Sequence, residues 1–189
     1  MKVAVWTTRR VVVCKKALLA VLLLMLTGSA FAQPPAGMAD QRAKAVTQVV
    51  LGILSYARWP VEPAQLRLCL VGPTEYTDDL VKGTTQATGR PVTVKRLLAD
   101  NPSIVGDCDA VYIGKLTGEE RARLFSALIG HPVLSISESD DPCTVGSLFC
   151  LRVGDEQVSF EVNLDSVARS GVRIHPSVLQ LSRRKPAAP

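Results

Sequence analysis

Cysteine is the residue type in this 189-residue chain whose number and spacing point most directly to chemistry. Four cysteines, Cys69, Cys108, Cys143 and Cys150, follow residue 32. In an exported protein, four cysteines indicate two disulfides, for which three pairings exist. Cys143 and Cys150 would close a short loop, which leaves Cys69 with Cys108. A zinc site is disfavoured because the sequence has no C-x-x-C pair and no histidine near the cysteines.

Two cationic clusters have residue types that bind anions or acidic partners. Arg58 and Trp59 end an apolar-periodic segment, and Arg173 and His175 alternate along a short extended segment, which places both on one side. Each cluster also has a purely structural interpretation. Trp59 would then be a core residue whose indole N–H donates to a carbonyl. Arg173 and His175 would form a solvated edge.

Glu161 is a third candidate for a binding surface. It lies between Phe160 and Val162 in an expected strand, so its side chain should face away from theirs. A solvent-exposed strand face is the structural interpretation. The search for catalytic motifs finds no G-x-S-x-G elbow, no G-x-G-x-x-G and no P-loop. The sequence therefore favours a binding or regulatory protein over an enzyme, with no cofactor.

The first 32 residues have the pattern of a cleavable export signal. Five basic residues precede the apolar run 17–26, which is too short for a membrane span and ends near Ala30-Phe31-Ala32. Cleavage after Ala32 would remove Cys14 and leave residues 33–189 as one domain. The whole chain has 22 basic and 17 acidic residues, so the mature chain would have 17 of each. This neutral charge gives no indication of nucleic-acid binding.

The elements expected to position these residues alternate between helix and strand. Helices are expected from Asp40 to about Ala57, from Thr77 to about Gln86, from a capping box at Thr117 to about Ile129, and over Leu164–Ser170. Strands are expected at 66–71, 92–97, 110–114 and 133–137, with a hairpin at 148–153 and 157–162. Residues 172–174 should be extended and 177–182 a final amphipathic turn or two. This order predicts an α/β fold with a mostly parallel central sheet flanked by helices and a C-terminal β-hairpin.

Several of these segments together resemble the YfiR family of periplasmic repressors. They are the sequences YARWP at 56–60, LRLCLVG at 66–72, VLSIS at 133–137, VSFEVNL at 158–164 and SGVRI at 170–174. With the four cysteines, the resemblance covers essentially all of residues 33–189.

The resemblance implies a function that the residues alone do not reach. It implies a non-enzymatic protein that binds the periplasmic domain of an inner-membrane diguanylate cyclase and holds the cyclase inactive. An OmpA-like outer-membrane lipoprotein would sequester this repressor, so that cyclic di-GMP and biofilm formation increase. The resemblance also implies a homodimer that responds to redox state through its disulfides.

For individual residues, the resemblance implies the pairs Cys69–Cys108 and Cys143–Cys150. It places Arg58, Arg173 and His175 in a surface pocket for small anionic or aromatic ligands, and Glu161 near the partner surface. The alternative function is that of a periplasmic small-molecule-binding protein that uses the cationic pocket.

Overall fold

The central element of the fold is a seven-stranded sheet in the order β3-β4-β2-β5-β6-β7-β8. The computed structural model describes residues 36–86, 88–138, 143, 146–155 and 157–183, so the expected signal segment lies outside the described residues. Strands β2 (Leu66–Val71), β4 (Pro91–Leu97), β5 (Ala110–Ile113), β6 (Leu134–Ser137) and β7 (Phe149–Val153) run parallel to their neighbours. The antiparallel edges are β3 (Thr84–Thr85) and β8 (Val158–Val162), and the predicted α/β class is confirmed.

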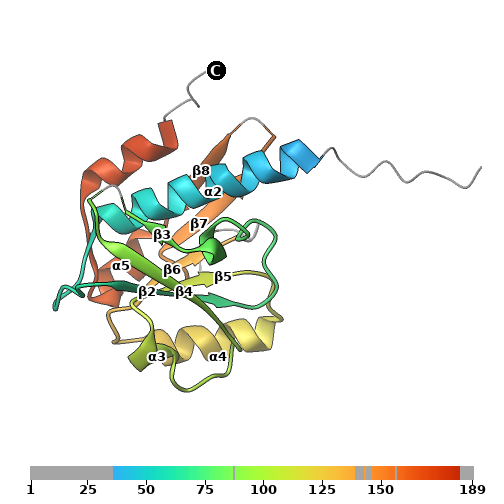
Figure 1. The fold of residues 1–189 in the computed structure, drawn as a ribbon. Helices are drawn as coiled ribbons and strands as arrows, with labels where there is room; N and C mark the ends of the chain where they lie inside the picture. The colour runs from blue at the N-terminus through green and yellow to red at the C-terminus, as the bar shows by residue number, and fades with distance from the viewer. Residues whose placement is uncertain (1–35, 87, 139–142, 144–145, 156, 184–189) are drawn as a thin grey trace, which may run out of the picture. The chain divides into compact units, whose positions relative to one another are not determined.

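Helices cover the two faces of the sheet (Figure 1). On one face, helix α2 (Ala36–Tyr56) packs residues such as Val46, Val50 and Ile53 against Leu68 and Leu70 of β2. On the other face, α3 (Ile104–Asp107) and α4 (Gly118–Leu128) cover a second core that contains Cys69, Val71 and Val111. The alternation of strand β2 therefore supplies both cores, as expected for a parallel sheet buried on both sides.

The C-terminal part of the chain returns to α2. Helix α5 (Leu164–Ser170) begins at Asn163, whose side chain accepts the Ser166 N–H, and ends at Gly171 in the left-handed conformation. Strand β9 (Arg173–Ile174) then pairs antiparallel with β1 (Ala57–Arg58), and the 3₁₀ helix η2 (Pro176–Arg183) follows. A β-carbon at Gly52 of α2 would lie 2.7 Å from Leu181, so η2 packs closely on α2 at that glycine.

Three local predictions are corrected by the structure. The helix expected at Thr77–Gln86 is only the 3₁₀ turn η1 (Leu80–Lys82), because Gly83 at φ 84° ends it and Thr84–Thr85 pair with β4 instead. Helix α2 starts at Ala36, before the expected cap at Asp40. The short helix α3 was not predicted, because four residues are too few to show a helical period.

Candidate functional site

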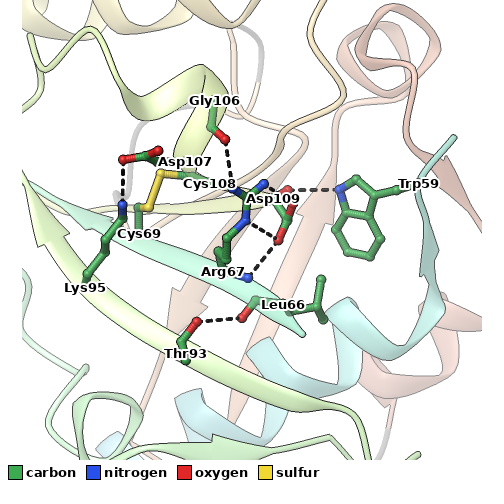
Figure 2. Close-up of polar contacts among 10 residues, drawn as sticks. All are labelled: Trp59, Leu66, Arg67, Cys69, Thr93, Lys95, Gly106, Asp107, Cys108 and Asp109. Atoms are coloured by element: carbon green, nitrogen blue, oxygen red, sulfur yellow. Dashed lines mark hydrogen bonds and ion pairs between the residues drawn. A yellow bond between two sulfur atoms is a disulfide. The ribbon is translucent and has the colours of Figure 1, made fainter. Parts of the chain in front are cut away.

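The Cys69–Cys108 disulfide lies at the centre of a polar network on the α3 side of the sheet (Figure 2). Cys69 belongs to β2 and Cys108 follows α3, and both residues are buried. Their Cα atoms are 5.8 Å apart, and the second disulfide joins Cys143 to Cys150. The structure thus contains the two pairs that the sequence spacing and the family resemblance both favoured.

Asp109, the residue after Cys108, organises the contacts beside this disulfide. Its carboxylate accepts two bonds from the Arg67 guanidinium, 3.1 Å from Nε and 2.8 Å from Nη2, and a third from the Arg67 backbone N–H. Arg67 also donates to the Gly106 carbonyl. The hydrogen bond to Asp109 raises the pKa of the Arg67 guanidinium above its ordinary value. The disulfide and this charged fork therefore both tie β2 to the segment between α3 and β5.

Trp59 joins the same network from the other direction. Its indole Nε1 donates to the Asp109 carbonyl oxygen at 3.0 Å, and the side chain is only 4% exposed (Figure 2). This is the geometry of a core residue with a satisfied polar end, the structural interpretation given above. Trp59 thus fixes the start of the β1–β2 connection, and its neighbour Arg58 is left on the surface.

A second charged contact lies across the disulfide. Lys95 of β4 donates to the Asp107 carboxylate at 2.9 Å, as Figure 2 shows. This hydrogen bond, followed by one from Ser103, lowers the pKa of the Asp107 carboxyl below its usual range. The pair is exposed, so its contribution to folding is small. Sequence reasoning missed Lys95–Asp107 and Arg67–Asp109; the opposite charges flanking Cys69 and Cys108 were the available signal.

The structure brings the predicted cationic residues Arg58, Arg173 and His175 together through the β1–β9 pair. Arg58 and Arg173 are direct cross-strand partners, and both are exposed. His175 lies two residues beyond Arg173, and its ring stacks on that of Tyr56 at a centroid distance of 6.2 Å. Like charges placed directly opposite each other disfavour the pairing unless an anion lies between them. This set, which we call the cationic cluster, can therefore donate hydrogen bonds to an anion beside an aromatic surface.

The arginines of the cationic cluster differ in their own bonding. Arg58 Nη1 donates to the carbonyls of Ser55 and Ala57 at 2.8 and 2.7 Å, which satisfies acceptors at the end of α2. Arg173 forms no hydrogen bond or ion pair with the described residues. The His175 Nδ1 accepts the Ser177 N–H at 3.2 Å, which leaves Nε2 as the donor of the neutral ring. Arg173 and His175 therefore have donors available to a ligand.

Glu161 lies in the seven-stranded sheet, separate from the β1–β9 pair that carries the cationic cluster. It is exposed on β8, and its carboxylate accepts from Arg152 of β7 at 2.6 Å. Its cross-strand partner is Cys150, and Cys143 Sγ lies 3.8 Å from the Glu161 carbonyl oxygen. A change at the Cys143–Cys150 disulfide would therefore be felt at Glu161.

The carboxyl edge of the parallel strands, where sheets of this kind commonly bind ligands, is occupied by the chain itself. A β-carbon at Gly114, after β5, would lie 1.9 Å from the Pro73 carbonyl oxygen, so the loops after β2 and β5 touch. The Glu138 carboxylate, after β6, accepts the N–H groups of Glu75 and Tyr76. Burial raises the pKa of Glu138. This edge is therefore a packed junction, and the exposed binding groups lie elsewhere.

Two searches of the described residues complete the survey of the site. No helix there is both long and apolar enough to cross a bilayer. No group of three or more histidine, cysteine or acidic side chains in that part of the chain could hold a metal ion.

The fold and its two disulfides define a small α/β domain stapled across its second core and at its hairpin. Residues 43–183 match the YfiR/HmsC-like family, and the chain belongs to that family. YfiR-like proteins are periplasmic regulators of cyclic di-GMP signalling, and they are regulatory rather than catalytic.

Proposed function

We propose that this protein represses an inner-membrane diguanylate cyclase by binding the cyclase's periplasmic domain. The observation that carries the proposal is the family match, which spans residues 43–183 and so includes both disulfides, the cationic cluster and Glu161. In the same proposal, an OmpA-like lipoprotein sequesters the repressor, the repressor is a homodimer, and no nucleic acid takes part. The cyclase then controls biofilm formation through cyclic di-GMP.

The principal test is deletion of the gene. Cyclic di-GMP should rise several-fold, because the cyclase loses its inhibitor, and biofilm should increase with it. Expression of the wild-type protein should restore the original level, and a second deletion that removes the cyclase should abolish the rise. An unchanged cyclic di-GMP level in cells that express the cyclase would refute the repressor function. Co-purification of the cyclase's periplasmic domain gives the direct measurement of binding.

A charge reversal at Glu161 locates the partner surface. Glu161→Arg removes the ion pair with Arg152 and should weaken repression or capture by the lipoprotein. Glu119→Arg is the matched control, since Glu119 forms a similar exposed pair with Arg123 on α4. Equal behaviour of the two variants would place the partner surface away from β8.

Export is part of the proposal. Cleavage after Ala32 should give a periplasmic protein that begins at Gln33. N-terminal sequencing of periplasmic material checks this, and a chain that begins at Met1 would contradict it.

The second candidate function is binding of a small anionic or aromatic molecule by the cationic cluster. The opposed pair Arg58 and Arg173 favours it, together with the Tyr56–His175 stack. Phenyl phosphate, which combines an aromatic ring with a dianion, should raise the midpoint of thermal unfolding. His175→Ala should reduce this rise, while His131→Ala, a change in an exposed turn, should not. An identical response of both variants would remove the cluster from consideration.

A further inference from the structure

A cavity of about 510 Å³ lies between α4 and α5, on the face of the sheet that α4 covers. Val133 and Ser135 of the β6 segment and Leu148 before β7 form its floor. Its volume falls within the range of about 300–1,000 Å³ typical of small-molecule pockets. None of the residues of the cationic cluster lines it. It is therefore a separate site, and the proposed function makes no use of it.

One side of α4 is devoted to this cavity. Ala122, Phe125, Ser126 and Ile129 recur at helical spacing and line it, whereas Leu124 is buried in the core. Ile129 at the rim is 75% exposed. Gly146, at φ 91°, forms part of the opposite wall, and a β-carbon there would lie 2.2 Å from the Phe125 ring. The ring therefore rests on a position that only glycine leaves open, which gives the cavity an aromatic wall.

Two buried hydroxyl groups in the lining have hydrogen-bonding capacity to spare. Ser135, 1% exposed, accepts the Leu148 N–H at 3.0 Å and donates to none of the described residues. Ser166, 7% exposed, forms no side-chain hydrogen bond with them. A buried hydroxyl without a partner costs free energy that a ligand oxygen would recover. A purely apolar occupant would leave both donors unsatisfied.

Charge in the lining has one sign. The described lining residues include two arginines, Arg121 of α4 and Arg169 of α5, and no acidic residue. Arg169 pairs with Asp165 on the exposed side of α5 and can approach an anion at the rim while it does so. Apolar walls, spare hydroxyl donors and a cationic rim together select an amphipathic anion.

We propose that this cavity binds a small amphipathic anion, with an aromatic or short acyl body against Phe125, Leu128 and Ile129. Its acidic head group would accept hydrogen bonds from the serine hydroxyls and the arginine rim. The head group distinguishes this occupant from an apolar side chain of a partner protein, which would use the walls alone.

Two fluorescent probes with the same aromatic body test the proposal on the purified full protein. 1-Anilinonaphthalene-8-sulfonate carries an anion, and N-phenyl-1-naphthylamine lacks it. Calorimetric and fluorescence titrations should show one site per chain. The sulfonate should bind at least about tenfold more tightly, as expected for charge-assisted hydrogen bonds. Equal or weaker binding of the sulfonate would overturn the assignment of an anion and indicate a pocket for an apolar group.

Variants locate the probe. Ala122→Phe and Ser126→Phe place a ring in the cavity from solvent-exposed helix positions and should each weaken sulfonate binding at least about tenfold, as loss of most of the apolar contact requires. Ala168→Phe, an exposed change on α5 outside the lining, is the matched control and should bind normally. Ser166→Ala should reduce the preference for the sulfonate and leave the uncharged probe unaffected. Unchanged binding in both cavity variants, or equal loss in the control, would overturn the site.

Discussion

Replacement of Trp59 by alanine should lower the free energy of unfolding by about 3–5 kcal/mol, the range for a large aromatic removed from a packed core. The side chain is 4% exposed and packs in the core formed with α2. Its loss also removes the 3.0 Å hydrogen bond to the Asp109 carbonyl. Urea unfolding followed by circular dichroism is the suitable measurement, because Trp59 is the only tryptophan in residues 33–189.

Two further variants separate the contributions at this position. Trp59→Phe keeps most of the apolar contact and loses only the indole donor, and the Asp109 carbonyl still accepts the Leu134 N–H. Its cost should be about 1 kcal/mol, the net value of one hydrogen bond. Arg58→Ala, at the exposed neighbour, should cost about 1 kcal/mol or less through the lost contacts to the Ser55 and Ala57 carbonyls. A Trp59→Ala variant as stable as Arg58→Ala would contradict the core assignment.

The regular elements were predictable because their signals are local. The run Leu66–Val71 is apolar and closed by Gly72-Pro73, and β2 has those bounds. The capping box at Thr117 is present, with both the Thr117 and the Glu120 side chains bonded as that motif requires. The predicted helix at Thr77–Gln86 failed because residues 84–85 are decided by pairing with β4, a contact that local sequence does not contain.

The candidate sites depend on such distant contacts even more. The sequence alone indicated that Arg173 and His175 share a side, but their union with Arg58 came from the family resemblance. Physically it requires the β1–β9 register, in which Arg58 faces Arg173. The fork between Arg67 and Asp109 likewise depends on β2 lying beside β5. Once a disulfide joins Cys69 to Cys108, however, the charges next to each cysteine in sequence are brought into reach.

Removal of the Cys69–Cys108 disulfide should destabilise the protein more than removal of Cys143–Cys150. The sequence separations are 39 and 7 residues. Chain-entropy estimates for these loops are about 4 and about 2.5 kcal/mol as upper values. The double variants Cys69→Ala/Cys108→Ala and Cys143→Ala/Cys150→Ala are matched, and alanine avoids a new buried hydroxyl. Urea unfolding under oxidising conditions gives the comparison, and a larger loss for the second pair would show that loop length does not set the order.

These losses lead to an expectation for regulation by redox state. Domains are stable by about 5–15 kcal/mol, so a loss of about 4 kcal/mol increases the unfolded fraction nearly a thousandfold. Periplasmic proteases would then lower the abundance of the repressor. A variant with all four cysteines replaced should therefore be less abundant and should raise cyclic di-GMP part of the way to the level of the gene deletion. Immunoblots and cyclic di-GMP measurements on the same cultures check both effects, and increased expression of the variant should restore repression if stability is the cause. Wild-type abundance together with wild-type cyclic di-GMP in the cysteine-free strain would contradict redox control through the disulfides.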